Sequence, residues 1–130
     1  MSRSQILWLS ISLPSLAICA ALGFKLGRGA TGILFAAAIF PDVSLIGAFA
    51  NVGKLRPERV KFYNLLHTVT IPVVLTLAGC ALAVLTQNFT VLLVGLAWFT
   101  HIAVDRTCGF RLRAADGSIR PDPTSQNLPL

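Results

Sequence analysis

The chain has 130 residues, of which 55% are hydrophobic and only 12% charged, and its formal net charge is +6. Soluble globular domains carry about 25% charged residues, so this composition excludes an ordinary soluble domain. With a mean hydropathy of +0.74, the chain is predicted to be an integral membrane protein.

Four long apolar runs follow one another along the chain. They span about residues 5–24, 30–50, 62–86 and 90–109. A helix needs about 20 residues to cross a hydrocarbon core, and each run is continuously apolar, whereas the strands of a membrane barrel alternate over about 10 residues. The sequence therefore predicts an all-α fold, a four-helix transmembrane bundle, with kinks at Pro14, Pro41 and Pro72.

The composition changes after the fourth run. Residues 1–113 are expected to form one transmembrane domain, and residues 114–130 a polar, proline-containing tail with little apolar surface to bury. The first run could instead be a cleaved signal peptide, because Arg3 precedes it and the small residues Ala20 and Ala21 follow. Three helices would then remain.

Basic residues are distributed unevenly between the connections. With four helices, both termini and the loop between the second and third helices share one face. Of the 11 Lys and Arg residues, only Lys25 and Arg28 fall on the other face. Because basic residues are retained on the cytoplasmic side, both termini are expected in the cytoplasm. These charges suit anionic lipid headgroups, so the lipid bilayer and not nucleic acid is the expected partner.

Both histidines and two carboxylates lie within or beside the apolar runs. They are Asp42, His67, His101 and Asp105. A charge costs roughly 2.5 to 3.5 kcal/mol at the centre of a membrane helix. Four ionisable groups in such runs therefore indicate that they belong to one site. Counted at about 1.5 Å per residue, they fall in the same half of the bilayer, and the i, i+4 spacing places His101 and Asp105 on one side of their helix. We expect one polar pocket near the cytoplasmic surface.

These residue types suit a divalent cation or acid-base catalysis. Imidazole nitrogens and carboxylate oxygens bind zinc, manganese or iron, and an open coordination position would activate water for hydrolysis. The candidate metal ligands and catalytic groups are Asp42, His67, His101 and Asp105. The candidate substrate contacts are Asn64 and Arg106, since a guanidinium binds phosphate or carboxylate with two hydrogen bonds. The alternative is structural, because such side chains also hydrogen-bond across membrane helices.

Three ordered blocks carry a resemblance to a known family. They read Phe40-Pro41-Asp42-Val43-Ser44-Leu45-Ile46-Gly47, Tyr63-Asn64-Leu65-Leu66-His67-Thr68 and Trp98-Phe99-Thr100-His101-Ile102-Ala103-Val104-Asp105-Arg106. Over about residues 34–113, the chain resembles a small bacterial integral-membrane family of unassigned function, the domain of unknown function 4260 group. The resemblance implies a compact multi-pass helical protein of the bacterial inner membrane and includes all six candidate site residues. The chain departs from that family's pattern in its tail, which contains no histidine. A looser similarity to inner-membrane proteins described as metal-dependent hydrolases implies hydrolysis.

Two functions remain open. The first is a metal-dependent, hydrolase-like enzyme acting on a lipid or an amphiphilic small molecule, because the pocket lies at the depth of the headgroups. The second is a non-catalytic subunit or binding module of a larger membrane complex, because small residues let helices approach closely, within the bundle or toward other membrane proteins. These residues are Gly23, Gly27, Ala36, Gly47, Gly79 and Gly95. A transport pathway is disfavoured, because the outer halves of the helices contain no acidic residue or histidine.

Overall fold

The computed structural model of the chain describes residues 1–122. Its elements in chain order are α1 (Arg3–Leu26), α2 (Arg28–Ile39), the 3-10 helix η1 (Phe40–Leu45), β1 (Phe49–Asn51), β2 (Lys54–Leu55), α3 (Pro57–Leu66), α4 (Thr70–Thr86) and α5 (Thr90–Cys108). Four helical spans are long and apolar enough to cross a membrane: Arg3–Leu26, Arg28–Leu45, Pro57–Thr86 and Thr90–Cys108. The prediction of an all-α fold with four membrane-spanning helices is confirmed. The cytoplasmic location of the termini remains a prediction.

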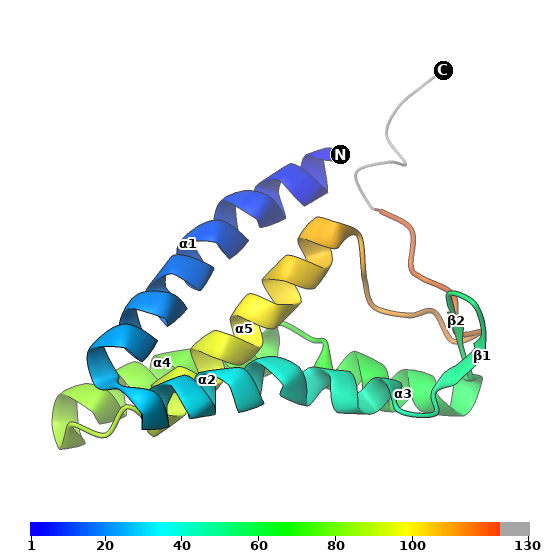
Figure 1. Ribbon diagram of the computed structural model, residues 1–130. Coiled ribbons are helices and arrows are strands. Elements are labelled where there is room, and N and C mark those ends of the chain that lie inside the picture. Colours follow the sequence, from blue (N-terminus) through cyan, green and yellow to red (C-terminus); the bar gives the residue numbers. More distant parts are fainter. Residues whose placement is uncertain (123–130) are drawn as a thin grey trace.

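The first two helices are joined by a single glycine. α1 begins with a capping box, in which the Ser2 hydroxyl accepts a hydrogen bond from the Gln5 backbone and the Gln5 side chain accepts one from the Ser2 backbone. The helix then continues through Pro14. At Gly27 the backbone φ is +89°, a value that glycine adopts readily and residues with a Cβ atom do not. α1 therefore ends there, and α2 leaves the turn at an angle to α1 (Figure 1).

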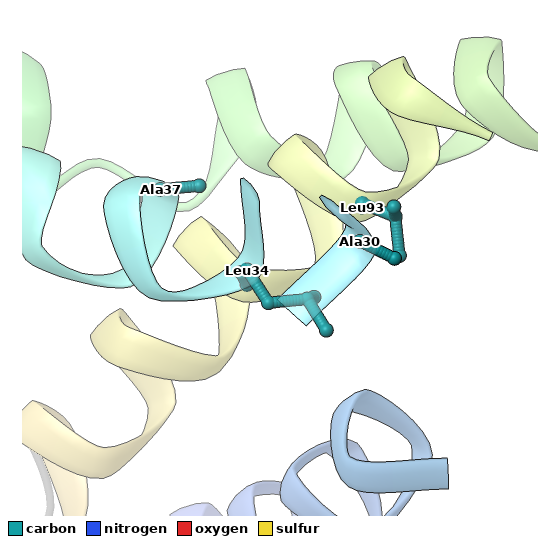
Figure 2. Close-up of a cluster of buried hydrophobic side chains, with 5 residues drawn as sticks. Ala30, Leu34, Ala37 and Leu93 are labelled. Carbon is teal, nitrogen blue, oxygen red and sulfur yellow. The ribbon is translucent and has the colours of Figure 1, made fainter. Parts of the chain in front are cut away.

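α5 is the central helix of the bundle and packs against α1, α2 and α4. Its side chains Leu93 and Ala97 form a buried apolar cluster with Ala30, Leu34 and Ala37 of α2, most of which is labelled in Figure 2. Neighbouring helices cover α5 on several sides. Polar residues on its last two turns can therefore face other helices and not lipid.

Two glycines set the distance between α4 and α5. A Cβ atom on Gly79 would lie 2.3 Å from the backbone nitrogen of Leu92, and one on Gly95 would lie 2.5 Å from the backbone nitrogen of Thr76. Neither position has room for a side chain. The close approach that small residues allow between membrane helices therefore occurs here within the bundle.

The second span ends earlier than the sequence indicates. A helix to about residue 50 is expected, but α2 ends at Ile39 and continues as η1 only to Leu45. Pro41 lies in the first turn of η1 and donates no backbone N–H, so it ends the α-helical ladder. The chain then forms an antiparallel hairpin of β1 and β2, whose turn contains Gly53 with a φ of +76°.

The third span is broken where the sequence predicts a continuous helix. α3 ends at Leu66, residues 67–69 are not helical, and α4 begins at Thr70. Pro72 stands in the first turn of α4, where a missing N–H costs nothing, whereas in a continuous helix its ring would clash with the preceding turn. The proline therefore marks a break, and the break leaves the backbone carbonyls of residues 66 and 67 without helical partners.

The segment after α5 returns over the hairpin. α5 ends at Gly109, whose φ is +90°. The backbone N–H of Leu55 then donates to the carbonyl of Gly117 over 3.0 Å, and Arg113 and Ile119 form a β-bridge. Figure 1 shows this segment and the hairpin on the right, away from the α1–α2 and α4–α5 turns at the lower left. The remainder of the predicted polar tail, residues 123–130, lies outside the described residues.

Candidate metal centre

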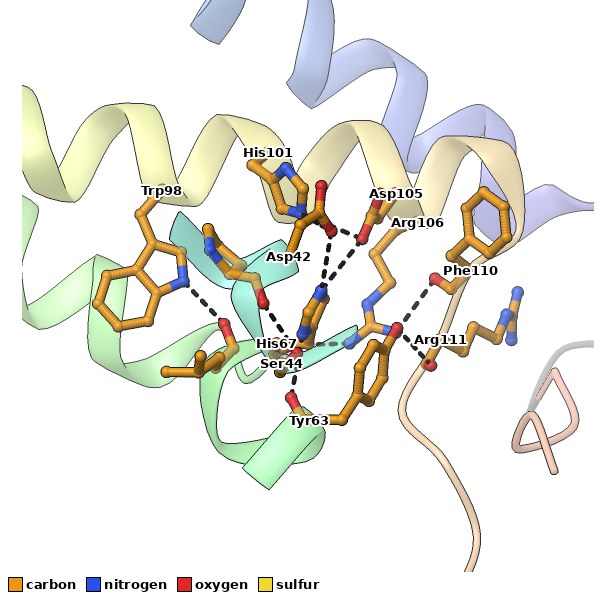
Figure 3. A network of polar contacts seen from close by, with 12 residues as sticks. Asp42, Ser44, Tyr63, His67, Trp98, His101, Asp105, Arg106, Phe110 and Arg111 are labelled. Atoms are coloured by element: carbon orange, nitrogen blue, oxygen red, sulfur yellow. Dashed lines mark hydrogen bonds and ion pairs between the residues drawn. The ribbon is translucent and has the colours of Figure 1, made fainter. Parts of the chain in front are cut away.

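Three separate elements bring both histidines and two carboxylates together. Asp42 lies in η1, His67 follows the last residue of α3, and His101 and Asp105 lie one helical turn apart on α5. Figure 3 shows these four side chains pointing toward one another. The structure thus contains the His/Asp cluster that the sequence predicts.

The Nε2 atoms of both histidines face the carboxylates. His67 Nε2 lies 3.9 Å from Asp42 Oδ1 and 3.5 Å from Asp105 Oδ2, and His101 Nε2 lies 3.5 Å and 3.4 Å from the same two oxygens. The side chains of His67 and His101 are only 2% and 13% exposed, whereas that of Asp42 is 48% exposed. The cluster is therefore enclosed on the histidine side and open at Asp42.

The hydrogen bond of the His67 ring orients its two nitrogens. Nδ1 lies 3.0 Å from the backbone carbonyl of Tyr63, which only accepts, so Nδ1 carries a proton and Nε2 is the nitrogen that faces the cluster. Among the described residues, neither Nε2 atom has a hydrogen-bond partner although both are buried. Two buried nitrogens are thus available as ligands.

The spacing of these atoms suits ligands around one ion better than hydrogen bonds. Hydrogen bonds between nitrogen and oxygen span about 2.7 to 3.2 Å, shorter than the 3.4 to 3.9 Å observed. A tetrahedral zinc site with bonds of about 2.0 to 2.1 Å has ligand atoms about 3.4 Å apart. One ligand atom from each of Asp42, His67 and His101 lies within 4.8 Å of the other two. This His/Asp triad could hold a metal ion.

Side chains of α5 satisfy the carbonyls that the helix break exposes. The indole N–H of Trp98 donates to the Leu66 carbonyl over 2.7 Å, and Arg106 donates to the His67 carbonyl over 3.0 Å. In a continuous helix these carbonyls would accept from residues 70 and 71. The two contacts therefore hold the non-helical backbone at His67 against the helix that carries His101.

The ring of Tyr63 covers His67. It stacks on the His67 imidazole with centroids 3.9 Å apart and an angle of 15° between the planes. This stacking limits the rotation of the His67 ring, and such restriction of a ligand side chain favours tight metal binding. Phe40 meets the indole of Trp98 edge-on at 5.2 Å and so packs η1 against α5.

The sequence from residue 8 to residue 119 matches the family model described as Domain of unknown function (DUF4260). The chain belongs to the DUF4260 family. No curated protein and no solved structure matches this DUF4260 chain. The family match does not assign an activity, so a proposal about the reaction or the ligand rests on the His/Asp cluster.

Asn64 and Arg106, the two predicted substrate contacts of the DUF4260 chain, lie beside the cluster. Both side chains form hydrogen bonds with backbone groups of the chain. Asn64 accepts from the Arg113 N–H over 2.8 Å and donates to the Arg113 carbonyl over 2.9 Å. Arg106 donates to the carbonyls of His67 and Phe110. Asn64 bonds to the segment after α5, whereas the His67 ring faces the carboxylates of the cluster. Asn64 thus holds the segment after α5, and Arg106 positions His67.

Two residues that sequence reasoning left out of the site contribute to it. Trp98 caps the end of α3, and Tyr63 both stacks on His67 and supplies its carbonyl acceptor. The signal for Trp98 was its position three residues before His101, which places both on one face of a helix. Tyr63 precedes His67 by four residues, but the sequence does not reveal that its ring turns toward the cluster.

Proposed function

We propose that this protein is a membrane-embedded, metal-dependent hydrolase-like enzyme that acts on a lipid or an amphiphilic small molecule. The observation that carries the proposal is the convergence of two imidazole nitrogens and two carboxylate oxygens at 3.4 to 3.9 Å. Electron-rich atoms directed at one point repel one another, and in a poorly solvated site the repulsion is large. A divalent cation between them, such as zinc, manganese or iron, turns this repulsion into binding.

The four residues divide into a ligand triad and a proton acceptor. Asp42, His67 and His101 would hold the cation, since one ligand atom from each lies within 4.8 Å of the other two. Asp105 lies 3.5 Å and 3.4 Å from the two ring nitrogens and is the group that accepts a proton. When bound, the cation supplies Lewis acidity and lowers the pKa of a coordinated water. Asp105 would take a proton from the attacking water and pass it to the leaving group as the bond between that group and the substrate breaks.

The position of the cluster supports an amphiphilic substrate. Asp105 lies within one helical turn of the end of α5, and Asp42 follows the end of α2. The cluster therefore lies near one end of the spans, at the level where headgroups join acyl chains. Its open side is at Asp42, the more exposed of the two carboxylates. We place this end at the cytoplasmic leaflet of a bacterial inner membrane, because most of the basic loops lie on this side.

Metal analysis of the full chain, purified in an uncharged detergent, tests the cation. We expect about one transition-metal ion per wild-type chain, and at least about tenfold weaker binding for Asp42→Asn and for His101→Ala. Glu58→Gln is the matched control for Asp42→Asn, because it removes one carboxylate charge from the first turn of α3. Wild-type protein that neither carries a metal nor takes one up would contradict the proposal.

Hydrolysis of phospholipids and acyl esters in the same micelles tests the catalytic part. Turnover that stops with a chelator, returns with zinc, and is lost in Asp105→Asn while the metal remains bound would support the enzyme. Metal binding without turnover, together with a partner that co-purifies at fixed stoichiometry, would favour a non-catalytic subunit instead. Gly79 and Gly95 are already used between α4 and α5, so they do not supply a surface for such a partner.

A further inference from the structure

A second polar site lies between α3 and the segment that follows α5. It is a pocket of about 340 Å³, and its lining residues are Pro57, Val60, Lys61, Asn64, Arg113, Ala115 and Arg120. Three of these side chains are basic and none is acidic. The pocket does not include any residue of the ligand triad, so it is separate from the candidate metal centre.

Arg113 is the buried basic residue of this pocket. The residue is only 3% exposed, and its Nε atom is buried without a hydrogen-bond partner among the described residues. One guanidinium nitrogen donates to the carbonyl of Gly53 over 2.6 Å, and the guanidinium lies 5.4 Å from the centre of the Tyr63 ring. These contacts are to neutral groups. A buried guanidinium is stabilised far better by an anion, to which it can donate two parallel hydrogen bonds.

The backbone of Arg113 is held in place by other residues of the pocket. Both the oxygen and the nitrogen of the Asn64 side chain bond to the Arg113 backbone, and Arg120 Nε donates to the Arg113 carbonyl over 3.1 Å. Lys61 lies one turn before Asn64 on α3 and is exposed. These bonds fix the buried Arg113 in the wall of the pocket, and the exposed Lys61 and Arg120 also line it.

The acidic side chains of residues 1–122 do not neutralise this pocket. The sequence has five acidic residues, all of them within residues 1–122. Two belong to the candidate metal centre, Asp116 pairs with Lys54 over 3.7 Å, Asp122 pairs with Arg111, and Glu58 does not line the pocket. Three basic groups thus converge without an acidic partner in the part of the chain that the structure describes.

We propose that this pocket binds a phosphate group, either of an anionic phospholipid or of a free phosphate compound. Guanidinium and ammonium groups around a concave site are the usual donors for phosphate oxygens. The pocket follows the fourth span, beside the hairpin, where a membrane protein meets headgroups. The inference does not depend on the metal or on hydrolysis. The two sites adjoin, however, since the Tyr63 ring contacts both the Arg113 guanidinium and the His67 imidazole.

Lipid binding by the full chain in an uncharged detergent tests the phosphate site. Native mass spectrometry would follow binding of dioleoyl phosphatidylglycerol, and equilibrium dialysis would follow inorganic phosphate. The test variant is Lys61→Gln/Arg120→Gln, which removes two exposed charges and leaves the buried Arg113 in place. The control is Arg3→Gln/Arg56→Gln, which removes two exposed charges that do not line the pocket.

We expect one phosphatidylglycerol per wild-type chain, about tenfold weaker binding in the test variant, and binding within about twofold of wild type in the control. Displacement of the lipid by millimolar inorganic phosphate would identify free phosphate as a sufficient ligand. Failure of phosphate to displace it would identify the membrane lipid as the source. Equal losses in the test variant and the control, or no loss in either, would overturn the proposal. The metal content of the test variant should equal that of wild type, which separates this result from the proposed function.

Discussion

The contact between α4 and α5 gives the sharpest prediction about stability. A methyl group on Gly79 would lie 2.3 Å from the Leu92 nitrogen, 2.4 Å from the Leu92 Cα and 2.8 Å from the Val91 carbonyl carbon. All three atoms belong to backbone, which cannot rotate away as a side chain can. Since ordinary contacts begin at 3.4 Å, the two helices would have to separate locally by about 1 Å.

The cost of Gly79→Ala follows from two opposing terms. Overpacking of a tight interface destabilises by about 1 to 3 kcal/mol, and alanine recovers up to about 1 kcal/mol through its better helix propensity. We therefore expect a net loss of about 1 to 2 kcal/mol. Gly32 is the matched control, because it lies inside α2 and a Cβ atom there meets nothing within 4 Å. Gly32→Ala should leave stability unchanged or raise it.

Unfolding in mixed micelles with increasing sodium dodecyl sulfate measures both variants. In a Trp8→Phe background, which leaves Trp98 as the single tryptophan, the fluorescence of Trp98 in α5 reports the unfolding. We expect the free energy of unfolding to fall clearly in Gly79→Ala and to stay unchanged or rise in Gly32→Ala. If Gly79→Ala were as stable as Gly32→Ala, the close approach of α4 and α5 would be refuted.

Three further predictions concern the surroundings of the candidate site and the turn near the hairpin. Arg106→Met removes the donor to the His67 carbonyl and should weaken metal binding about tenfold with the fold retained; a competition titration with a chelating dye checks this, and unchanged affinity contradicts a positioning role. Trp98→Phe leaves the carbonyl at the end of α3 without its donor and should cost about 1 to 2 kcal/mol in the same unfolding assay; a neutral result would show that another group replaces the indole. Hydrogen bonds from Ser118 lower the pKa of Asp116, so this carboxylate stabilises the turn above its ordinary pKa and the effect is lost as the pH falls through the lowered pKa. In Ser118→Ala the pKa should rise toward its ordinary value, as measured by carbon NMR of the carboxyl group; an unchanged value would assign the shift to another cause.

The meeting of the polar residues could be predicted from the sequence because helix geometry is regular. Each residue has a depth fixed by its distance from the end of its span, at about 1.5 Å per residue. Asp42 near the end of a descending span, His67 near the start of an ascending one and His101 near the end of the last therefore fall at one level. The i, i+4 spacing of His101 and Asp105 then settles which side of α5 faces the cluster.

The breaks in the second and third spans could not be predicted in the same way. Both runs are apolar all around, so their periodicity does not distinguish one long helix from a helix, a break and a second helix. Pro72 signals an interruption, but the sequence alone does not decide between a kink and a break. The sequence also does not reveal that Asn64, in the last turn of α3, bonds to the backbone of Arg113.

The hairpin and the segment after α5 could not be predicted from the sequence, for a different reason. Their positions depend on contacts between distant parts of the chain, such as the backbone bond from Leu55 to Gly117 and the bond from Arg113 to the Gly53 carbonyl. Polar composition after residue 113 resembles that of a solvated tail. Only the packing reveals that Arg113 is buried there and lines a basic pocket.

X-ray absorption at the zinc edge of the metal-loaded chain tests most directly whether His67, His101 and Asp42, from three separate elements, bind one cation. The expected spectrum has nitrogen and oxygen ligands at about 2.0 to 2.2 Å, with outer-shell scattering from two imidazole rings that falls to one ring in His101→Ala. A spectrum without imidazole scattering, or one that His101→Ala leaves unchanged, would contradict binding of one cation by these three residues.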